Sequence, residues 1–90
     1  MTASTAFSVN GTSAIKLIAA ASTLNAIVQN RGGYNIYIGG SGVTDTNGLE
    51  IQSGQTFNLS LTNLSLTDEI WAVAISSAGS NTSNVRVLTY

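Results

Sequence analysis

Short apolar stretches with a period of two recur along this 90-residue chain, and clusters of Gly, Asn, Ser and Asp separate them. Residues Thr56–Leu61 show the pattern most clearly, because Phe57, Leu59 and Leu61 alternate with polar residues. Successive side chains of a β-strand point to opposite faces, so this alternation indicates a strand with one buried face. Several such strands with turn residues between them are typical of a sandwich or barrel.

The sequence therefore predicts an all-β fold: one β-sandwich domain over residues 1–90, with about seven or eight short antiparallel strands. A jelly-roll and an immunoglobulin-like arrangement both fit this pattern. We expect Asn10-Gly11 to form a turn with the glycine at positive φ, and residues 30–33 to form a hairpin-like connection. Residues 19–22 have room for one helical turn at most. The predicted strands are Thr5–Val9, Ser13–Ala19, Leu24–Asn30, Tyr34–Ile38, Leu49–Gln52, Thr56–Leu61, Glu69–Ile75 and Asn84–Thr89.

The segment Glu69–Ile75 departs from simple alternation, since apolar residues occupy both of its faces. A strand of this kind is expected at the centre of a sheet or covered on both sides. One sandwich core needs only one of the two faces. We therefore expect the second face, which carries either Trp71 or the small residues Ala72 and Ala74, to meet another protein chain.

The composition excludes several classes of function. Charged residues make up only 8% of the chain, against ~25% in ordinary soluble domains. The chain has no His and no Cys, which excludes imidazole acid–base chemistry, thiol nucleophiles, disulfides and His or Cys metal sites. Three Lys and Arg residues are too few to neutralise nucleic-acid phosphates, and no apolar run approaches the ~20 residues of a membrane span.

The longest predicted loop, Gly39–Gly48, brings oxygen-bearing residues together. Asp45, Asn47 and Glu50 have the ligand chemistry of a Ca²⁺ site, but two carboxylates are few for such a site and the spacing does not fit an EF-hand. We predict a turn instead, in which Asp45 and Asn47 bond their own backbone and Gly48 has positive φ. No metal and no cofactor are expected.

The remaining carboxylates raise the hypothesis of a glycosidase pair, which needs two carboxyl groups facing each other across a cleft. Glu50, Asp68 and Glu69 are instead predicted to be solvated residues of turns and strand ends. With so few titratable groups, the sequence predicts no catalytic residues and no enzymatic activity.

Aromatic residues are the best candidates for contacts with a partner. Tyr37 faces away from its apolar neighbours in sequence, so we expect it to be exposed, while Trp71 is expected in the core or at a subunit interface. Glycines after the tyrosine-bearing strand let a backbone approach closely. The candidate interface residues are Tyr34, Tyr37, Gly39, Gly40 and Trp71.

Three segments carry a resemblance to a known group. They are FSVNGTSAIKLIAA near the start, LNAIVQNRGGYNIYIGGSGVTDTNGLEIQSGQTFNLSL in the middle and DEIWAVAISSAGSNTSNVRVL near the end. The most specific pieces are Tyr37-Ile38-Gly39-Gly40, Asn47-Gly48 and Val85-Arg86-Val87-Leu88. Together they resemble small tailed-bacteriophage head proteins, a β-sandwich group of decoration or auxiliary capsid proteins that is also found in head-fibre domains.

The resemblance implies a non-enzymatic structural virion protein, made in the host cytoplasm, that binds the capsid exterior as a decoration protein. The implied partner is the major capsid protein of the phage. We also expect self-association, with a trimer favoured, and no nucleic-acid or membrane partner. The alternative function is that of a small binding module, either a glycan-binding domain or a fibre-attachment domain at the head, neck or tail.

Overall fold

The computed structural model describes residues 3–18, 25–60 and 69–89. These residues form eight strands and one 3-10 helical turn, so the predicted all-β fold is confirmed. The strands are β1 (Ala3–Asn10), β2 (Ile15–Ile18), β3 (Asn25–Asn30), β4 (Ile36–Gly39), β5 (Leu49–Ile51), β6 (Thr56–Ser60), β7 (Ile70–Ala74) and β8 (Thr82–Thr89), with the helical turn η1 (Ser76–Ala78) between β7 and β8.

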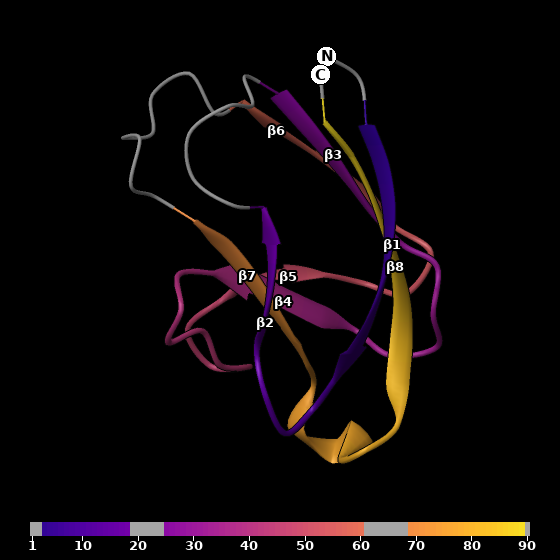
Figure 1. Ribbon diagram of the computed structural model, residues 1–90. Helices are drawn as coiled ribbons and strands as arrows, with labels where there is room; N and C mark the ends of the chain where they lie inside the picture. Colours follow the sequence, from indigo (N-terminus) through magenta and orange to yellow (C-terminus); the bar gives the residue numbers. More distant parts are fainter. Residues whose placement is uncertain (1–2, 19–24, 61–68, 90) are drawn as a thin grey trace.

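The strands form two antiparallel sheets of four strands each (Figure 1). Sheet A has the order β1-β8-β3-β6, and sheet B has the order β2-β7-β4-β5. Most connections pass from one sheet to the other, and only β4 and β5 are consecutive neighbours in one sheet. This order is that of a jelly roll, which selects one of the two predicted arrangements.

The predicted local connections were only partly correct. Residues 30–33 join β3 of sheet A to β4 of sheet B, so they do not form a hairpin. Gly11 does not have positive φ; among the described glycines only Gly54 and Gly79 do. A Cβ at Gly11 would lie 2.5 Å from the carbonyl oxygen of Ile75, so a close backbone approach requires this glycine. A turn dipeptide in the sequence predicts that the chain reverses its direction. It does not predict which of the two sheets the next strand joins.

The main core lies between the two sheets. Val9, Val28, Val85, Ile36 and Ile51 are almost completely buried there. Burial of a side chain of this size stabilises the fold by ~1.5–3 kcal/mol. The expected inward positions in β8, Val85 and Val87, are both in this core, as period-two alternation predicts.

Strand β2 shows a local departure from alternation. Its pairing with β7 shifts between Lys16 and Ile18, so Leu17 is an extra residue in the ladder. Leu17 and Ile18 are consequently both buried, although the sequence pattern placed them on opposite faces. A bulge re-aims side chains in this way, and its position depends on the partner strand.

Several strand ends also differ from the prediction. Strand β1 extends to Ala3 and Asn10, and β4 begins at Ile36 because residues before it belong to the connection from sheet A. Strand β8 begins at Thr82, inside the segment expected to be a loop.

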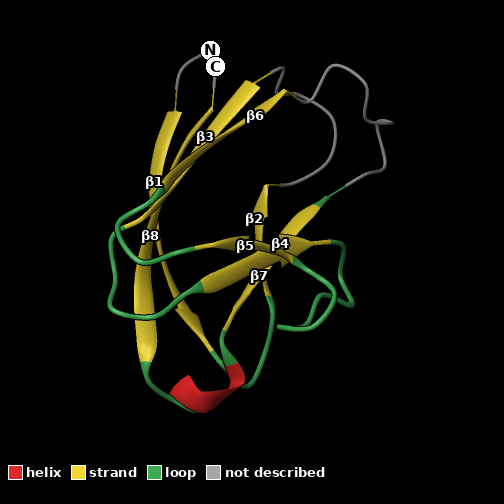
Figure 2. Cartoon of the chain, turned by 180° about the vertical axis from the view of Figure 1, so that it is seen from behind, coloured by secondary structure: helices red, strands yellow, loops and turns green. Residues whose placement is uncertain are grey.

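Figure 2 shows η1 at one end of the molecule, where the Gly11 N–H donates to Gly79 O at 2.8 Å. The helical turn expected at residues 19–22 and the predicted inward Leu61 lie outside the described residues.

One buried polar residue links the two sheets. Asn30, at the end of β3, has no exposed surface, and its amide nitrogen donates to Tyr34 O at 2.8 Å and to Ile51 O at 3.1 Å. Its amide oxygen accepts from Gly32 N–H at 3.2 Å and from the Ser83 hydroxyl at 2.7 Å. The side chain therefore joins β3 and β8 of sheet A to β5 of sheet B. We call these four contacts the Asn30 clamp.

Candidate interaction surfaces

The outer face of sheet B carries a second apolar cluster. Tyr37 and Val73 lie on this face, and the loop of residues 40–48 folds back so that Val43 packs against them. All three side chains are buried. Both faces of the central strand β7 are therefore apolar, as predicted, because Ala72 and Ala74 contribute to the core between the sheets. The neighbour that covers Val73 is a loop of the same chain, which corrects the expectation that a second chain is needed there.

Glycines at the ends of loop 40–48 make this packing feasible. A Cβ at Gly48 would lie 2.7 Å from Tyr37 Cβ and 2.7 Å from Val43 Cγ2, and one at Gly39 would lie 3.1 Å from Val43 Cγ2. Gly48 does not have positive φ, contrary to the prediction. The close backbone approach that we expected toward a partner is made inside the chain.

Tyr37 is buried, not exposed as expected, with 8% of its surface accessible. Its hydroxyl donates to Glu50 Oε2 at 2.7 Å, and the two residues are paired across β4 and β5. The hydrogen bond to Glu50 raises the pKa of Tyr37 above its usual range, and burial and the charges of Glu50 and Asp45 add to this effect. Glu50 is therefore the carboxylate in direct contact with this hydroxyl.

Trp71 is half-buried on the outer face of sheet B, beside the Tyr37 cluster. Its indole nitrogen donates to Glu69 Oε1 at 3.2 Å, and Lys16 Nζ lies 5.8 Å from the ring centroid. Lys16 also forms an ion pair of 2.9 Å with Glu69, which lowers the pKa of the Glu69 carboxyl. Glu69 is therefore held by two partners, although a solvated carboxylate was expected.

The candidate interface residues do not form one patch. Tyr34 is partly buried and packs against the core between the sheets. Gly39 and Trp71 lie on the sheet B side, and Gly40 is exposed with open space around the position of a Cβ. No partner contact tests these residues, so their role at an interface stays a prediction.

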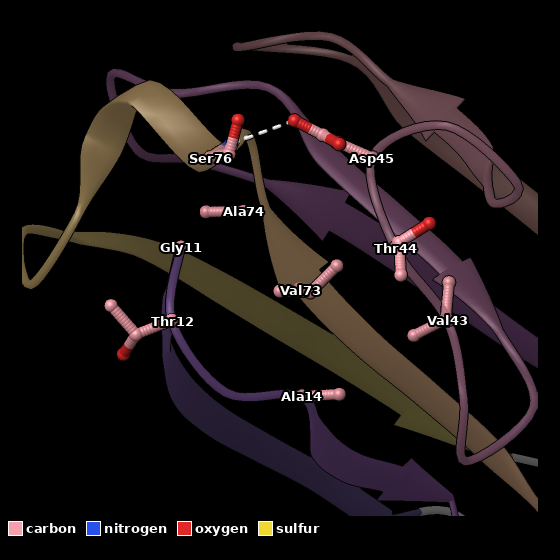
Figure 3. Close-up of a pocket in the computed structure, with 9 residues that line it drawn as sticks. All are labelled: Gly11, Thr12, Ala14, Val43, Thr44, Asp45, Val73, Ala74 and Ser76. Atoms are coloured by element: carbon pink, nitrogen blue, oxygen red, sulfur yellow. Dashed lines mark hydrogen bonds between the residues drawn. The ribbon is translucent and has the colours of Figure 1, made fainter.

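A shallow hollow of about 280 Å³ lies between the β1–β2 connection, the end of β7 and loop 40–48 (Figure 3). Its carboxylate, Asp45, accepts a hydrogen bond of 2.9 Å from Ser76 N–H, and the Ser76 contacts lower the pKa of Asp45. Asp45 therefore ties together segments 31 residues apart in sequence, instead of mainly closing its own turn as predicted. Asn47 does stay within the loop, because its side-chain oxygen accepts from Thr44 N–H at 2.8 Å.

In the described part of the chain, no three acidic residues gather closely enough to hold a metal ion. The proposed glycosidase carboxylates have separate structural partners: Glu50 contacts Tyr37, and Glu69 contacts Lys16 and Trp71. Asp68 lies outside the described residues.

The outer face of sheet A has a different character. A hollow of about 320 Å³ is lined by two exposed arginines and by the apolar side chains of Ile27 and Leu88. Arg86 pairs with Gln29 across β8 and β3, and Leu88 pairs with Ile27 in the next row. The residues lining this hollow are Ser4, Ile27, Gln29, Arg31, Thr56, Arg86 and Leu88. Composition alone did not indicate that two of the three cations of the chain lie together.

Among the edge strands that the structure describes, β1 is the longest. It pairs with β8 on one side, and no other described strand pairs with its second side. Its eight residues include no charged residue. Thr5 is exposed and Phe7 is half-buried at this edge, although both lie on the same side of the strand as the fully buried Val9. Unpaired N–H and C=O groups at such an edge are a template for another strand.

No known protein family matches this chain, and no curated protein is similar enough to it to count as a relative. Within the described residues there is no helix of sufficient length and apolar character to cross a membrane.

Proposed function

We propose that this chain is a non-enzymatic structural protein of a tailed bacteriophage that binds the exterior of the capsid as a decoration protein. Its location would be the virion surface, and its partner the major capsid protein. The resemblance of the three quoted segments supports this proposal. The jelly roll is compatible with it, since this fold occurs in viral capsid proteins and also in lectins, but the fold alone does not identify a function.

The observation that carries the proposal is the open edge of β1. An extended segment of a capsid protein could add there as a fifth strand of sheet A, and main-chain hydrogen bonds would supply the affinity. Such a strand would also cover Phe7, which is half-buried at this edge. Native proteins commonly protect long edges with charges or proline, and β1 has neither.

The carboxylates support a structural role. Asp45 holds the backbone of Ser76, Glu50 accepts from the Tyr37 hydroxyl, and Glu69 binds Lys16 and Trp71. Each of these groups therefore has a structural use in this fold, and general acid–base chemistry is not required to explain why it is there.

We expect Thr5→Lys to weaken capsid binding at least ~10-fold, equivalent to ~1.4 kcal/mol. A lysine at this position would point toward the interior side of the edge strand, where an added strand would have to bury its charge. The measurement is co-sedimentation with capsids assembled from the major capsid protein of the phage that encodes this chain. The matched control is Ser8→Lys, which adds the same charge at an exposed position on the opposite side of β1, paired with Asn84 and not with Arg86.

The control should bind within about threefold of the unmodified protein, a difference of less than ~1 kcal/mol. Equal binding by both variants and the unmodified protein would show that β1 is not the docking edge. If the unmodified protein does not co-sediment with these capsids but does bind on a glycan array, the alternative of a glycan-binding or fibre-attachment module replaces the proposed function.

A further inference from the structure

The outer face of sheet A concentrates positive charge in a chain that has little charge of any kind. Arg31 and Arg86 both line its hollow, and none of the four strands of this sheet contains an acidic residue. The one ion pair within the described residues joins Lys16 to Glu69, on the sheet B side. Two neighbouring cations on one sheet face repel each other, so this arrangement costs stability unless a negative partner covers it.

The outer side of sheet B offers the opposite charge. Lys16 compensates Glu69 there, which leaves Asp45 and Glu50 as the uncompensated carboxylates. Glu50 accepts a hydrogen bond from the Tyr37 hydroxyl, and Asp45 belongs to loop 40–48, which packs against Tyr37 through Val43. Glu50 is exposed and Asp45 is half-exposed, so each can meet a partner while it keeps its internal hydrogen bond.

We infer that the Arg31 and Arg86 face of one copy binds the Asp45 and Glu50 face of a second copy. Two positive groups would then meet two negative groups, and Ile27 and Leu88 would supply an apolar floor at the contact. The inference builds on the self-association expected for this protein, but it does not require capsid binding.

The size of the molecule is sufficient for such a contact. Its two larger extents are 34 Å and 22 Å, an outline of roughly 750 Å², so a standard interface of ~800 Å² per partner would use most of one side of the molecule. Because two different patches meet, the contact is heterologous. Repetition of a heterologous contact closes a ring, of which a trimer is the smallest, if the rotation between copies permits it, and otherwise extends an open stack of copies.

The test is a charge exchange, followed by sedimentation equilibrium at low salt. We expect the unmodified protein to associate, and Arg86→Glu and Glu50→Arg each to lose at least ~10-fold in association constant, a difference of ~1.4 kcal/mol. Neither variant should associate well alone, but an equimolar mixture should recover association, because each altered face then meets a complementary face. Higher salt should weaken the unmodified complex, since exposed charges are screened.

A control variant and a substitute variant complete the test. Asn81→Asp lowers the net charge by one unit, against two for Arg86→Glu, but at an exposed loop position away from the hollow, and should associate like the unmodified protein. If Glu50→Arg fails to fold, Glu50→Gln removes the charge and keeps an oxygen that can accept from Tyr37. An unmodified protein that stays monomeric at millimolar concentration, or an Arg86→Glu variant that associates normally, would overturn the inference, as would a mixture that does not recover.

Discussion

Replacement of Asn30 by alanine is expected to destabilise the fold by ~3–5 kcal/mol, a large part of the ~5–13 kcal/mol available to a domain of this size. The substitution removes the four hydrogen bonds of the Asn30 clamp. It also leaves Ile51 O without this donor in the interior, whereas the Ser83 hydroxyl keeps its hydrogen bond of 3.1 Å to Tyr34 O. A buried polar group that loses its partner costs ~1–3 kcal/mol. Because the clamp joins the sheets, the loss should lower the stability of the whole sandwich.

The measurement is the free energy of unfolding from denaturant titration. Asn58→Ala is the matched control, since Asn58 is exposed on the adjacent strand β6, and its substitution should change stability by less than ~0.5 kcal/mol. An Asn30→Ala variant within ~1 kcal/mol of this control would show that the clamp does not hold the sheets together.

Truncation of Tyr37 to alanine is expected to cost ~3–5 kcal/mol, as for other large buried aromatic side chains. The ring fills the space between Val73 and the Val43 side chain of loop 40–48. Its loss should leave a cavity beneath the loop and remove the hydrogen bond to Glu50. An exposed interface residue would behave differently, because its truncation would weaken assembly and leave the fold intact.

Tyr37→Phe separates the two contributions. This variant keeps the ring and loses the hydroxyl, so it should cost only ~0.5–1.5 kcal/mol. The measurement is the free energy of unfolding of both variants, from thermal or denaturant unfolding. If Tyr37→Ala is as stable as Tyr37→Phe, the ring is not packed as described and the original expectation of an exposed tyrosine returns.

Much of the strand content could be predicted because it depends on neighbouring residues. Alternation in β8 placed Val85 and Val87 in the core, and the apolar character on both faces of Ile70–Ala74 indicated a central strand. The bulge at Leu17 was missed, since it depends on how β2 pairs with β7. The pattern of residue types along one strand does not determine its register with a partner strand that is distant in sequence.

The parts that were missed depend on contacts between distant segments. Asn30 stands in an Asn-Arg-Gly-Gly stretch that resembles an ordinary turn, yet its partners include Ile51 and Ser83. In the same way, alternation along β4 places Tyr37 on the outer face of its sheet, away from the core between the sheets, but loop 40–48 covers its side chain. Sequence alone indicates which face of a strand is apolar, but not which segment of the chain will cover that face.

The candidate interface could be predicted only in part. The sequence shows how few charged residues the chain has, but only the strand order identifies β1 as a long open edge. The charge separation between the two outer faces likewise appears only when Arg31 and Arg86 are placed on one side of the sandwich and Asp45 and Glu50 on the other.

The most direct test of the central claim is amide hydrogen exchange along β1, measured on the free protein and on the protein bound to capsids. Alternate amides of an edge strand point away from its partner and are free to exchange. If the capsid protein adds a strand there, exchange across residues 3–10 should slow at least ~10-fold on binding, because these amides gain hydrogen bonds. Unchanged exchange across β1 in the fully bound protein would contradict the account.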